Sequence, residues 1–144
     1  MKINDDILKH LAKTFDRLEQ GAILGVKDGN VNYFHIDDIG NSRSSKDIYT
    51  PDCNSLNQIL KEWRKDGISF CGMVHSHSTG KTMLSKADTK YAQALCSAFE
   101  LEDVLMPVIE IGIVKNNYYI YSVDVNGEIN TVSTLKQTPL LKKF

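Results

Sequence analysis

A strand that runs directly into two histidines, followed by a helix that begins near an aspartate, constrains this chain more than any other feature. Residues 68–74 are mostly apolar and read as a buried strand, and His75 and His77 follow it. Because alternate residues of a strand face the same side, both imidazoles are expected to point to one face. Residues 86–99 carry apolar side chains at helical spacing, which makes Asp88 a first-turn residue facing back toward the strand end. The strand end and the helix start are therefore expected to share one site.

These residues, together with Ser85, form the pattern H-x-H-x7-S-x2-D. Two imidazole nitrogens and one carboxylate oxygen suit a zinc ion that keeps its fourth position for water. At the residue frequencies of this chain, the pattern arises by accident in on the order of one such sequence in a thousand. The sequence therefore predicts a metal site formed by His75, His77 and Asp88.

Simpler interpretations exist for each part of the pattern. A pair of histidines beside a strand can be packed or solvated without any ligand. Ser85 and Asp88 also suit a helix cap, with Ser85 as the N-cap and Asp88 as the acidic residue at the third helical position. Capping and metal binding are compatible, since a capped residue is already oriented, and only a metal site accounts for all four side chains.

At these residues the chain resembles the JAMM/MPN (JAB-type) zinc metalloproteases, a family that includes isopeptidases acting on ubiquitin and ubiquitin-like modifiers. The family signature is a glutamate early in the domain, followed by H-x-H-x7-S-x2-D. The acidic residue placed just ahead of the first core strand here is Glu19, within the segment 18–25 that reads LEQGAILG. The resemblance covers most of the chain and implies the MPN fold.

The resemblance also implies a role for each residue of the signature. His75, His77 and Asp88 would bind one Zn2+ per chain, Glu19 would be the general base that acts on the metal-bound water, and Ser85 would help hold the oxyanion. This division of roles agrees with general chemistry, since zinc activates water and polarises a carbonyl, while a carboxylate transfers the proton. A hydroxyl aimed at the carbonyl oxygen stabilises charge that develops only in the tetrahedral state.

Two features of this chain depart from the family pattern. Many members have proline directly after the second histidine, whereas this chain has Ser78. The family commonly spaces its glutamate as E-x-x-G-x-L-x-G, while Glu19 lies six residues before Gly25, one fewer than in that pattern. A solvated carboxylate at a helix end is the alternative interpretation of Glu19, and Glu110, in an apolar strand, is the fallback base. The other glutamates considered fall on or near helices or after a turn: Glu62, Glu100, Glu102 and Glu128.

The function expected from these residues is hydrolysis of an isopeptide or peptide bond in a protein or peptide substrate, next to a small ubiquitin-like modifier. One alternative keeps the fold and loses the activity, which leaves a binding or scaffolding module. Another is a zinc hydrolase or deaminase of a small molecule, because zinc, water and glutamate can attack other carbons. An open groove would favour a protein substrate, and a closed pocket would favour a small molecule.

Composition limits the number of domains, the binding partners and the location that can be expected for this chain. With 144 residues and 42% hydrophobic content, the chain is long enough for one domain with a real core and has no room for a second. A formal charge of −1 gives no basis for binding nucleic acid or membrane through bulk charge. With neither an apolar stretch of about 18 residues nor an apolar signal-peptide core, the expected location is the cytoplasm. Three cysteines without a C-x-x-C spacing argue against a disulfide framework.

The other elements follow from periodicity and turn residues. An amphipathic helix is expected to begin near Asn4 or Asp5, with its apolar stripe extending from Ile3 to Leu18. The remaining predicted strands lie at 22–26 and 31–36 around a turn at 27–30, and at 107–114, 118–125 and 128–133. A surface loop is expected at 37–54, which either flanks the cleft and touches substrate or is passive. A second helix carries Leu56 and Trp63 on its apolar face, with Asp52, Asn54 or Ser55 as its N-cap and its end at Gly67. This order predicts an α/β (α+β layered) domain over 1–135, with a mixed sheet flanked by helices, a C-terminal β-meander and a flexible tail at 136–144.

Overall fold

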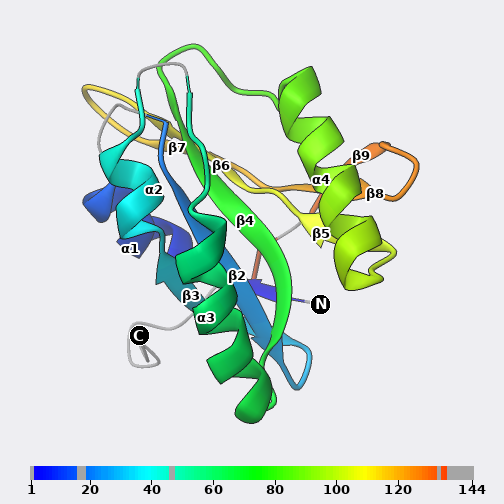
Figure 1. Ribbon diagram of the computed structural model, residues 1–144. Helices are drawn as coiled ribbons and strands as arrows, with labels where there is room; N and C mark the ends of the chain where they lie inside the picture. Colours follow the sequence, from blue (N-terminus) through cyan, green and yellow to red (C-terminus); the bar gives the residue numbers. More distant parts are fainter. Residues whose placement is uncertain (1, 16–18, 46–47, 133, 136–144) are drawn as a thin grey trace.

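The computed structural model describes residues 2–15, 19–45, 48–132 and 134–135, and within them a mixed sheet carries helices on both faces (Figure 1). The helices are α1 (Asp5–Thr14), α2 (Asp38–Ser42), α3 (Cys53–Lys65) and α4 (Lys86–Phe99). The strands are β1 (Lys2–Asn4), β2 (Gly21–Lys27), β3 (Asn30–Ile36), β4 (Ser69–Ser78), β5 (Asp103–Leu105), β6 (Val108–Ile111), β7 (Asn117–Tyr119), β8 (Tyr121–Asp124), β9 (Ile129–Thr131) and β10 (Thr134–Leu135). The predicted fold class, a layered α/β domain with a mixed sheet, is confirmed.

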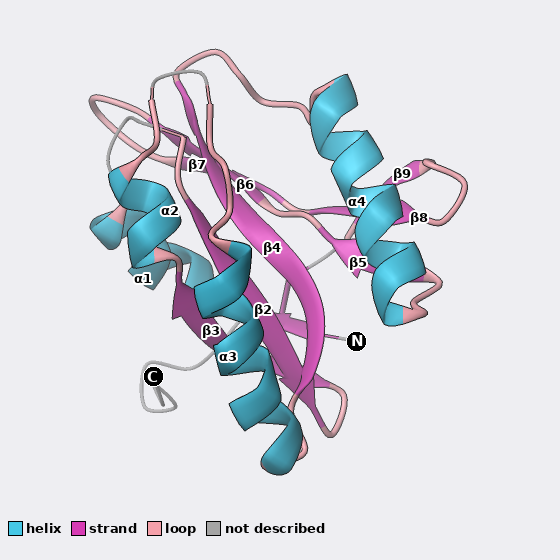
Figure 2. Cartoon of the chain, viewed as in Figure 1, coloured by secondary structure: helices cyan, strands magenta, loops and turns pink. Residues whose placement is uncertain are grey.

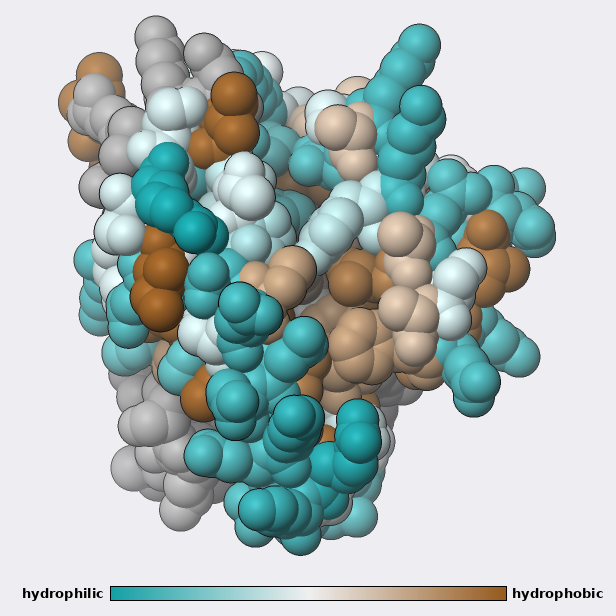
Figure 3. Space-filling view, in the orientation of Figure 1, coloured by the Kyte–Doolittle hydropathy of each residue, from teal (hydrophilic) through white to brown (hydrophobic). Residues whose placement is uncertain are grey.

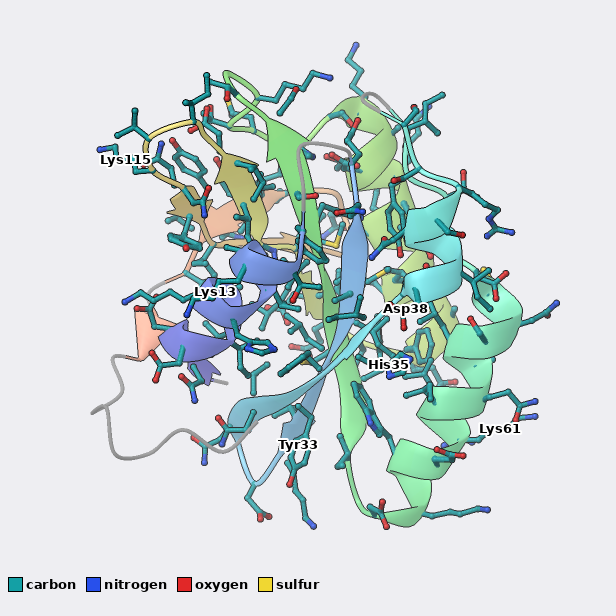
Figure 4. All side chains as sticks on the ribbon, turned by 90° about the vertical axis from the view of Figure 1, so that its left-hand side faces the viewer. Lys13, Tyr33, His35, Asp38, Lys61 and Lys115 are labelled. Atoms are coloured by element: carbon teal, nitrogen blue, oxygen red, sulfur yellow. The ribbon has the colours of Figure 1, made fainter. Side chains whose placement is uncertain are left out.

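Alternating side chains on β2 build two cores, one on each face of the sheet. Ala22 and Leu24 pack in a cluster with the apolar stripe of α1, whereas Ile23 packs in a second cluster with residues of α3 and α4. Figure 2 shows α3 and α4 in front of the sheet, and the view turned by 90° places α1 and α3 on opposite sides of β2 and β4 (Figure 4). The sheet is therefore the middle of three layers.

Strand β4 lies at the centre of the sheet and carries the histidines. It pairs antiparallel with β2, and then parallel with β5 at Gly72 and with β6 over its last four residues. A Cβ atom on Gly72 would lie 2.1 Å from the carbonyl oxygen of Leu105, so only glycine allows β5 to approach this closely. β4 continues through His75 and His77 to Ser78, four residues beyond the apolar run.

The predicted helices agree closely with the structure. α1 begins at Asp5 behind an Asn4 cap, whose side chain accepts a hydrogen bond of 2.9 Å from the Asp6 N–H. Its stripe is shorter than predicted, since the helix ends at Thr14, Ile3 belongs to β1, and Leu18 lies outside the described residues. α3 has Asp52 as its N-cap, and α4 occupies the predicted range with Ser85 as its N-cap.

The prediction of a loop over 37–54 is wrong in part, because α2 lies within it and α3 already begins at Cys53. Asp37 is the physical reason. Its buried carboxylate caps α2 by accepting the Gly40 N–H and also accepts the N–H of Asp52. A polar segment can fold inward when one carboxylate satisfies several backbone donors in this way.

The C-terminal strands are more fragmented than the predicted meander. The strand expected over 118–125 is divided at Ile120, because β7 pairs with β6 whereas β8 pairs with β5 and β9. The short strands β1, β5 and β10 are not foreseen by the sequence pattern. Ser133 and the predicted tail at 136–144 lie outside the described residues. None of the helices in the described part of the chain is long and apolar enough to cross a membrane.

Candidate functional site

The end of β4, the residues that precede β2 and the start of α4 surround a cleft of about 670 Å³. Four of the five site residues predicted from the sequence come from these elements, and the fifth, Ser85, caps α4. All five line the cleft: Glu19, His75, His77, Ser85 and Asp88. The other lining residues are Ile48, Tyr49, Gly80, Lys81, Thr82, Met83 and Ala87.

The two histidines are buried at the floor of the cleft. His75 and His77 expose 6% and 3% of their surface, and their ring centroids are 6.5 Å apart with nearly parallel planes. The Nδ1 atom of His75 and both ring nitrogens of His77 make no hydrogen bond within the described residues. Buried nitrogens without partners are costly unless something else occupies them, so these atoms point to a ligand.

Glu19 reaches the histidines because the ladder between β2 and β4 continues beyond the first residue of β2. The Ser76 N–H donates to the Gln20 carbonyl at 2.9 Å, and the Gln20 N–H donates to the Ser76 hydroxyl at 3.0 Å. The Glu19 N–H is held by the Ser45 carbonyl at 2.9 Å. The Oε1 atom of Glu19 then lies 3.6 Å from Nε2 of His77, so the shorter spacing to Gly25 still brings this carboxylate to the site.

Ser85 and Asp88 form the capping box that the sequence suggests as the simpler interpretation. The Asp88 N–H donates to the Ser85 hydroxyl, and the Ser85 N–H donates to Oδ2 of Asp88, both at 3.0 Å. The same Oδ2 atom lies 3.7 Å from Nε2 of His77. A carboxylate has about four lone-pair positions, so capping leaves Asp88 able to serve a second partner.

Comparison with known proteins places this arrangement in a family. The family model described as prokaryotic homologs of the JAB domain matches residues 2–132. The chain belongs to this family. No protein with a curated description matches the sequence.

Solved structures resemble this JAB domain in fold at low sequence identity. A protein from Desulfitobacterium hafniense superposes with a TM-score of 0.68 at 16% identity, covering 95% of this chain and 93% of that one. A protein from Salinibacter ruber gives 0.60 at 17% identity, with 96% and 93% covered. A JAB1/MPN domain protein from Archaeoglobus fulgidus gives 0.57 at 16% identity, with 95% and 97% covered. These similarities support the fold of the JAB domain.

Burial sets the protonation state of the two histidines. It lowers the pKa of His75 to about 4, against the opposing effect of the Asp88 carboxylate. Burial also lowers the pKa of His77, and Asp88 again opposes it. Both imidazoles of the JAB domain are therefore neutral at pH 7, which is the form that binds a metal.

Glu110, the fallback base, has a different place in the structure. Its Oε2 atom accepts the Gly80 N–H at 2.7 Å, and its Oε1 atom accepts the Asn117 side-chain amide at 2.8 Å. The hydrogen bond from Asn117, followed by that from Gly80, lowers the pKa of Glu110. Glu110 thus braces the segment between β4 and α4, together with the Tyr121 hydroxyl, which donates to the Thr82 carbonyl at 2.7 Å. It is not among the residues that line the cleft.

The sequence pattern did not identify the cleft residues that come from the loops. Tyr49 packs its ring against His75, while Ile48 and Met83 are 64% and 66% exposed. None of the three lies in a periodic segment or a recognisable motif, so only the tertiary fold reveals them.

A separate apolar groove lies between α3 and α4, where Figure 3 shows apolar side chains. Leu60, Phe70 and Phe99 are among the residues that line it.

The described residues can be tested for their fit to a metal ion. Among them, no group of three or more His, Cys, Asp or Glu stands in an arrangement that could hold a metal ion. In a tetrahedral zinc site with bonds of about 2.0–2.1 Å, two ligand atoms lie roughly 3.4 Å apart. The 3.7 Å between Nε2 of His77 and Oδ2 of Asp88 is only a few tenths longer. This pair of donors is therefore compatible with zinc, and Nδ1 of His75 is a further buried nitrogen without a hydrogen bond among the described residues.

Proposed function

We propose that this JAB domain is a zinc-dependent metallopeptidase that hydrolyses an isopeptide or peptide bond, next to a small ubiquitin-like protein modifier. One observation carries the proposal. Two carboxylates, from Glu19 and Asp88, approach the same buried nitrogen, Nε2 of His77, at 3.6 and 3.7 Å. Three segments of the chain thus converge on one point of the cleft, with donors of the types that a zinc hydrolase requires.

His75, His77 and Asp88 would hold the zinc ion. When bound, zinc would polarise the scissile carbonyl and lower the pKa of a coordinated water to about 7. The chain supports this by keeping both imidazoles buried and neutral, and by fixing Asp88 through the first turn of α4. Ligands held before binding lose less freedom when the ion arrives.

Glu19 is suited to move the proton. Its carboxylate would take a proton from the attacking water as the water oxygen bonds to the carbonyl carbon. The same proton would pass to the nitrogen as the carbon–nitrogen bond breaks, so the amine leaves neutral and Glu19 returns to its ionised form. The short distance to His77 supports this role, because a base must lie within reach of the reacting water.

Ser85 has a hydrogen available for the substrate. Its oxygen accepts the N–H of Asp88, and a hydroxyl that accepts one bond can still donate its own hydrogen. Donation to the carbonyl oxygen would stabilise the negative charge that develops during attack. Capping and catalysis would therefore use different parts of the same hydroxyl.

The form of the cleft favours a polypeptide substrate over a small molecule. Ile48 and Met83 lie at the cleft, and both remain largely exposed. Small-molecule sites usually enclose most of their ligand, whereas an extended chain needs an open groove. Exposed apolar side chains at the cleft can contact the side chains of a peptide, and the polar residues of the cleft can hydrogen-bond its backbone.

The first test is the metal content of the purified protein, measured by mass spectrometry. We expect about one zinc per chain in the wild type and none in the double variant His75→Ala/His77→Ala. His35→Ala is the matched control, because His35 is a histidine on β3 outside the cleft residues (Figure 4). A wild-type protein without zinc after reconstitution would contradict the proposal and favour a scaffolding role.

The second test is activity on a panel of isopeptide-linked ubiquitin-like conjugates. The zinc-loaded wild type should release the modifier, while Glu19→Gln should retain zinc and lose turnover by about 10²-fold or more. Full activity in Glu19→Gln would refute the assignment of the base. Zinc binding without cleavage of any conjugate would refute the proposed substrate class.

A further inference from the structure

Tyr49 is in contact with His75, one of the two buried histidines of the cleft. Its ring packs edge-on against His75, with centroids 5.6 Å apart and planes at 66°. The β2–β4 register places Gly21 directly opposite His75, and a Cβ atom on Gly21 would lie 2.3 Å from the Tyr49 ring. The Tyr49 ring therefore occupies the space that a side chain at residue 21 would fill.

A buried carboxylate holds the other end of Tyr49. Its hydroxyl donates to Oδ2 of Asp37 at 2.7 Å, and Asp37 is only 1% exposed. The same carboxylate accepts the backbone N–H groups of Gly40 and Asp52, at 3.0 Å each. Asp37 thus ties Tyr49 to the start of α2 and to the cap of α3.

The segment that carries Tyr49 is also attached to β2. The side chain of Asn41 accepts the Gly21 N–H at 2.7 Å and donates to the Gly21 carbonyl at 3.1 Å. The Asp37 N–H donates to the same carbonyl at 3.1 Å. The Tyr49 ring is consequently fixed from both sides, by its hydroxyl and by the backbone that it covers.

We propose that Tyr49 is a positioning residue whose ring fixes the ring of His75, and that the bond to Asp37 adds to the hold that the Gly21 backbone already gives that ring. The hydroxyl of Tyr49 is committed to Asp37, so the side chain acts on His75 through its ring. Groups that orient a metal-binding histidine change metal affinity by roughly 10–100-fold when removed. The inference rests on the proposed function only in taking His75 as a metal ligand.

The test combines zinc affinity with a spectroscopic readout of His75. Zinc binding is measured by competition with a chromogenic chelator for wild type, Tyr49→Leu and Tyr49→Phe. We expect affinity to fall about tenfold in Tyr49→Leu, which removes the ring, and to change less than about threefold in Tyr49→Phe, which keeps it. Tyr33→Leu is the matched control, because Tyr33 lies on β3 near the hairpin with β2, away from the cleft (Figure 4).

The spectroscopic readout uses metal-free protein, so it does not depend on activity. An aromatic ring 5.6 Å from His75 should shift the NMR signals of the imidazole protons and give nuclear Overhauser contacts with them. The shift should disappear in Tyr49→Leu and persist in Tyr49→Phe. The contacts in wild-type protein can be measured even if Tyr49→Leu fails to fold.

Two results would overturn the inference. One is the absence of contacts between Tyr49 and His75 in the wild-type spectrum. The other is equal zinc affinity in folded Tyr49→Leu, Tyr49→Phe and wild type. If wild type binds no zinc, the proposed function fails, while the contacts and shifts in metal-free protein still decide whether the Tyr49 ring packs against His75 as the inference requires.

Discussion

Replacing Ser85 separates the capping role that the structure shows for its hydroxyl from the oxyanion role that we propose for it. In Ser85→Ala the N–H of Asp88 loses its acceptor, while the Ser85 N–H keeps its bond to Asp88. Loss of a serine N-cap costs about 1 kcal/mol. With an unfolding entropy of about 2.1 cal/mol/K per residue over 144 residues, that cost lowers Tm by roughly 3 °C. Loss of the hydroxyl as an oxyanion donor should also lower kcat by about 10²–10³-fold.

Ser85→Gly is the variant that tells these effects apart. Glycine at an N-cap costs only a few tenths of a kcal/mol, so Tm should return to within about 1 °C of wild type. It has no hydroxyl, so turnover of the zinc-loaded protein should stay low, whereas Ser85→Thr should retain both properties. Calorimetry and a peptidase assay below all transition temperatures give the two readings. Recovery of activity together with Tm in Ser85→Gly would refute an oxyanion role and leave Ser85 as a cap.

Three further predictions follow from other contacts. Gly72→Ala forces a Cβ toward the Leu105 carbonyl and should cost about 1–3 kcal/mol in urea denaturation; an unchanged midpoint would show that β5 can move aside. In metal-free protein the unfolded His75 titrates near 6.5 and the folded one near 4, so the unfolded chain binds more protons between these values. His75 should therefore cost the folded protein up to about 3 kcal/mol as the pH falls from 6.5 toward 4. The loss should be smaller in His75→Gln, where His77, whose pKa burial also lowers, still titrates; equal slopes for the two proteins would contradict the prediction. Glu110→Ala removes the acceptor of the Gly80 N–H, so exchange of that amide should accelerate about tenfold or more, while unchanged protection would mean that Glu110 does not brace this segment.

Local pattern was sufficient for the elements that have strong periodicity and clear caps. α4 begins and ends where the spacing predicts, because Ser85 and Asp88 satisfy the first backbone donors of the helix. The turn between β2 and β3 follows from its own residues, since Asp28 and Gly29 both adopt positive φ. In such segments the signal lies within a few neighbouring residues.

The elements that the pattern missed depend on distant partners. β5 contains three residues, and its pairing with Gly72 and with β8 defines it as a strand. The division at Ile120 likewise arises from pairing with different strands: the residues before it pair with β6, and the residues after it pair with β5. α2 exists because Asp37 folds into the core and caps it. No local rule contains that information.

The signature residues could be named from the sequence, but their supporting contacts could not. The sequence placed His75 and His77 on one face, and the structure has them side by side at the cleft floor. It could not show that Glu19 would reach them, because the reach depends on two hydrogen bonds between Gln20 and Ser76. The sequence could not single out Tyr49 for the same reason, since its proposed role depends on contacts with Gly21 and Asp37.

The cap and the proposed site share residues, so the capping of α4 by Ser85 and Asp88 is compatible with the metal-binding and oxyanion roles that we propose for them. The bonds that start α4 fix the Asp88 carboxylate, and the ladder that ends β4 fixes His77, so folding itself brings the two within 3.7 Å. Loss of the α4 cap or of the β4 ladder would move Asp88 and His77 apart, although neither residue itself had changed. A substitution at Gly21, where a side chain would displace the Tyr49 ring, is therefore expected to weaken zinc binding by roughly 10-fold or more, whereas substitutions at exposed positions away from the cleft should not.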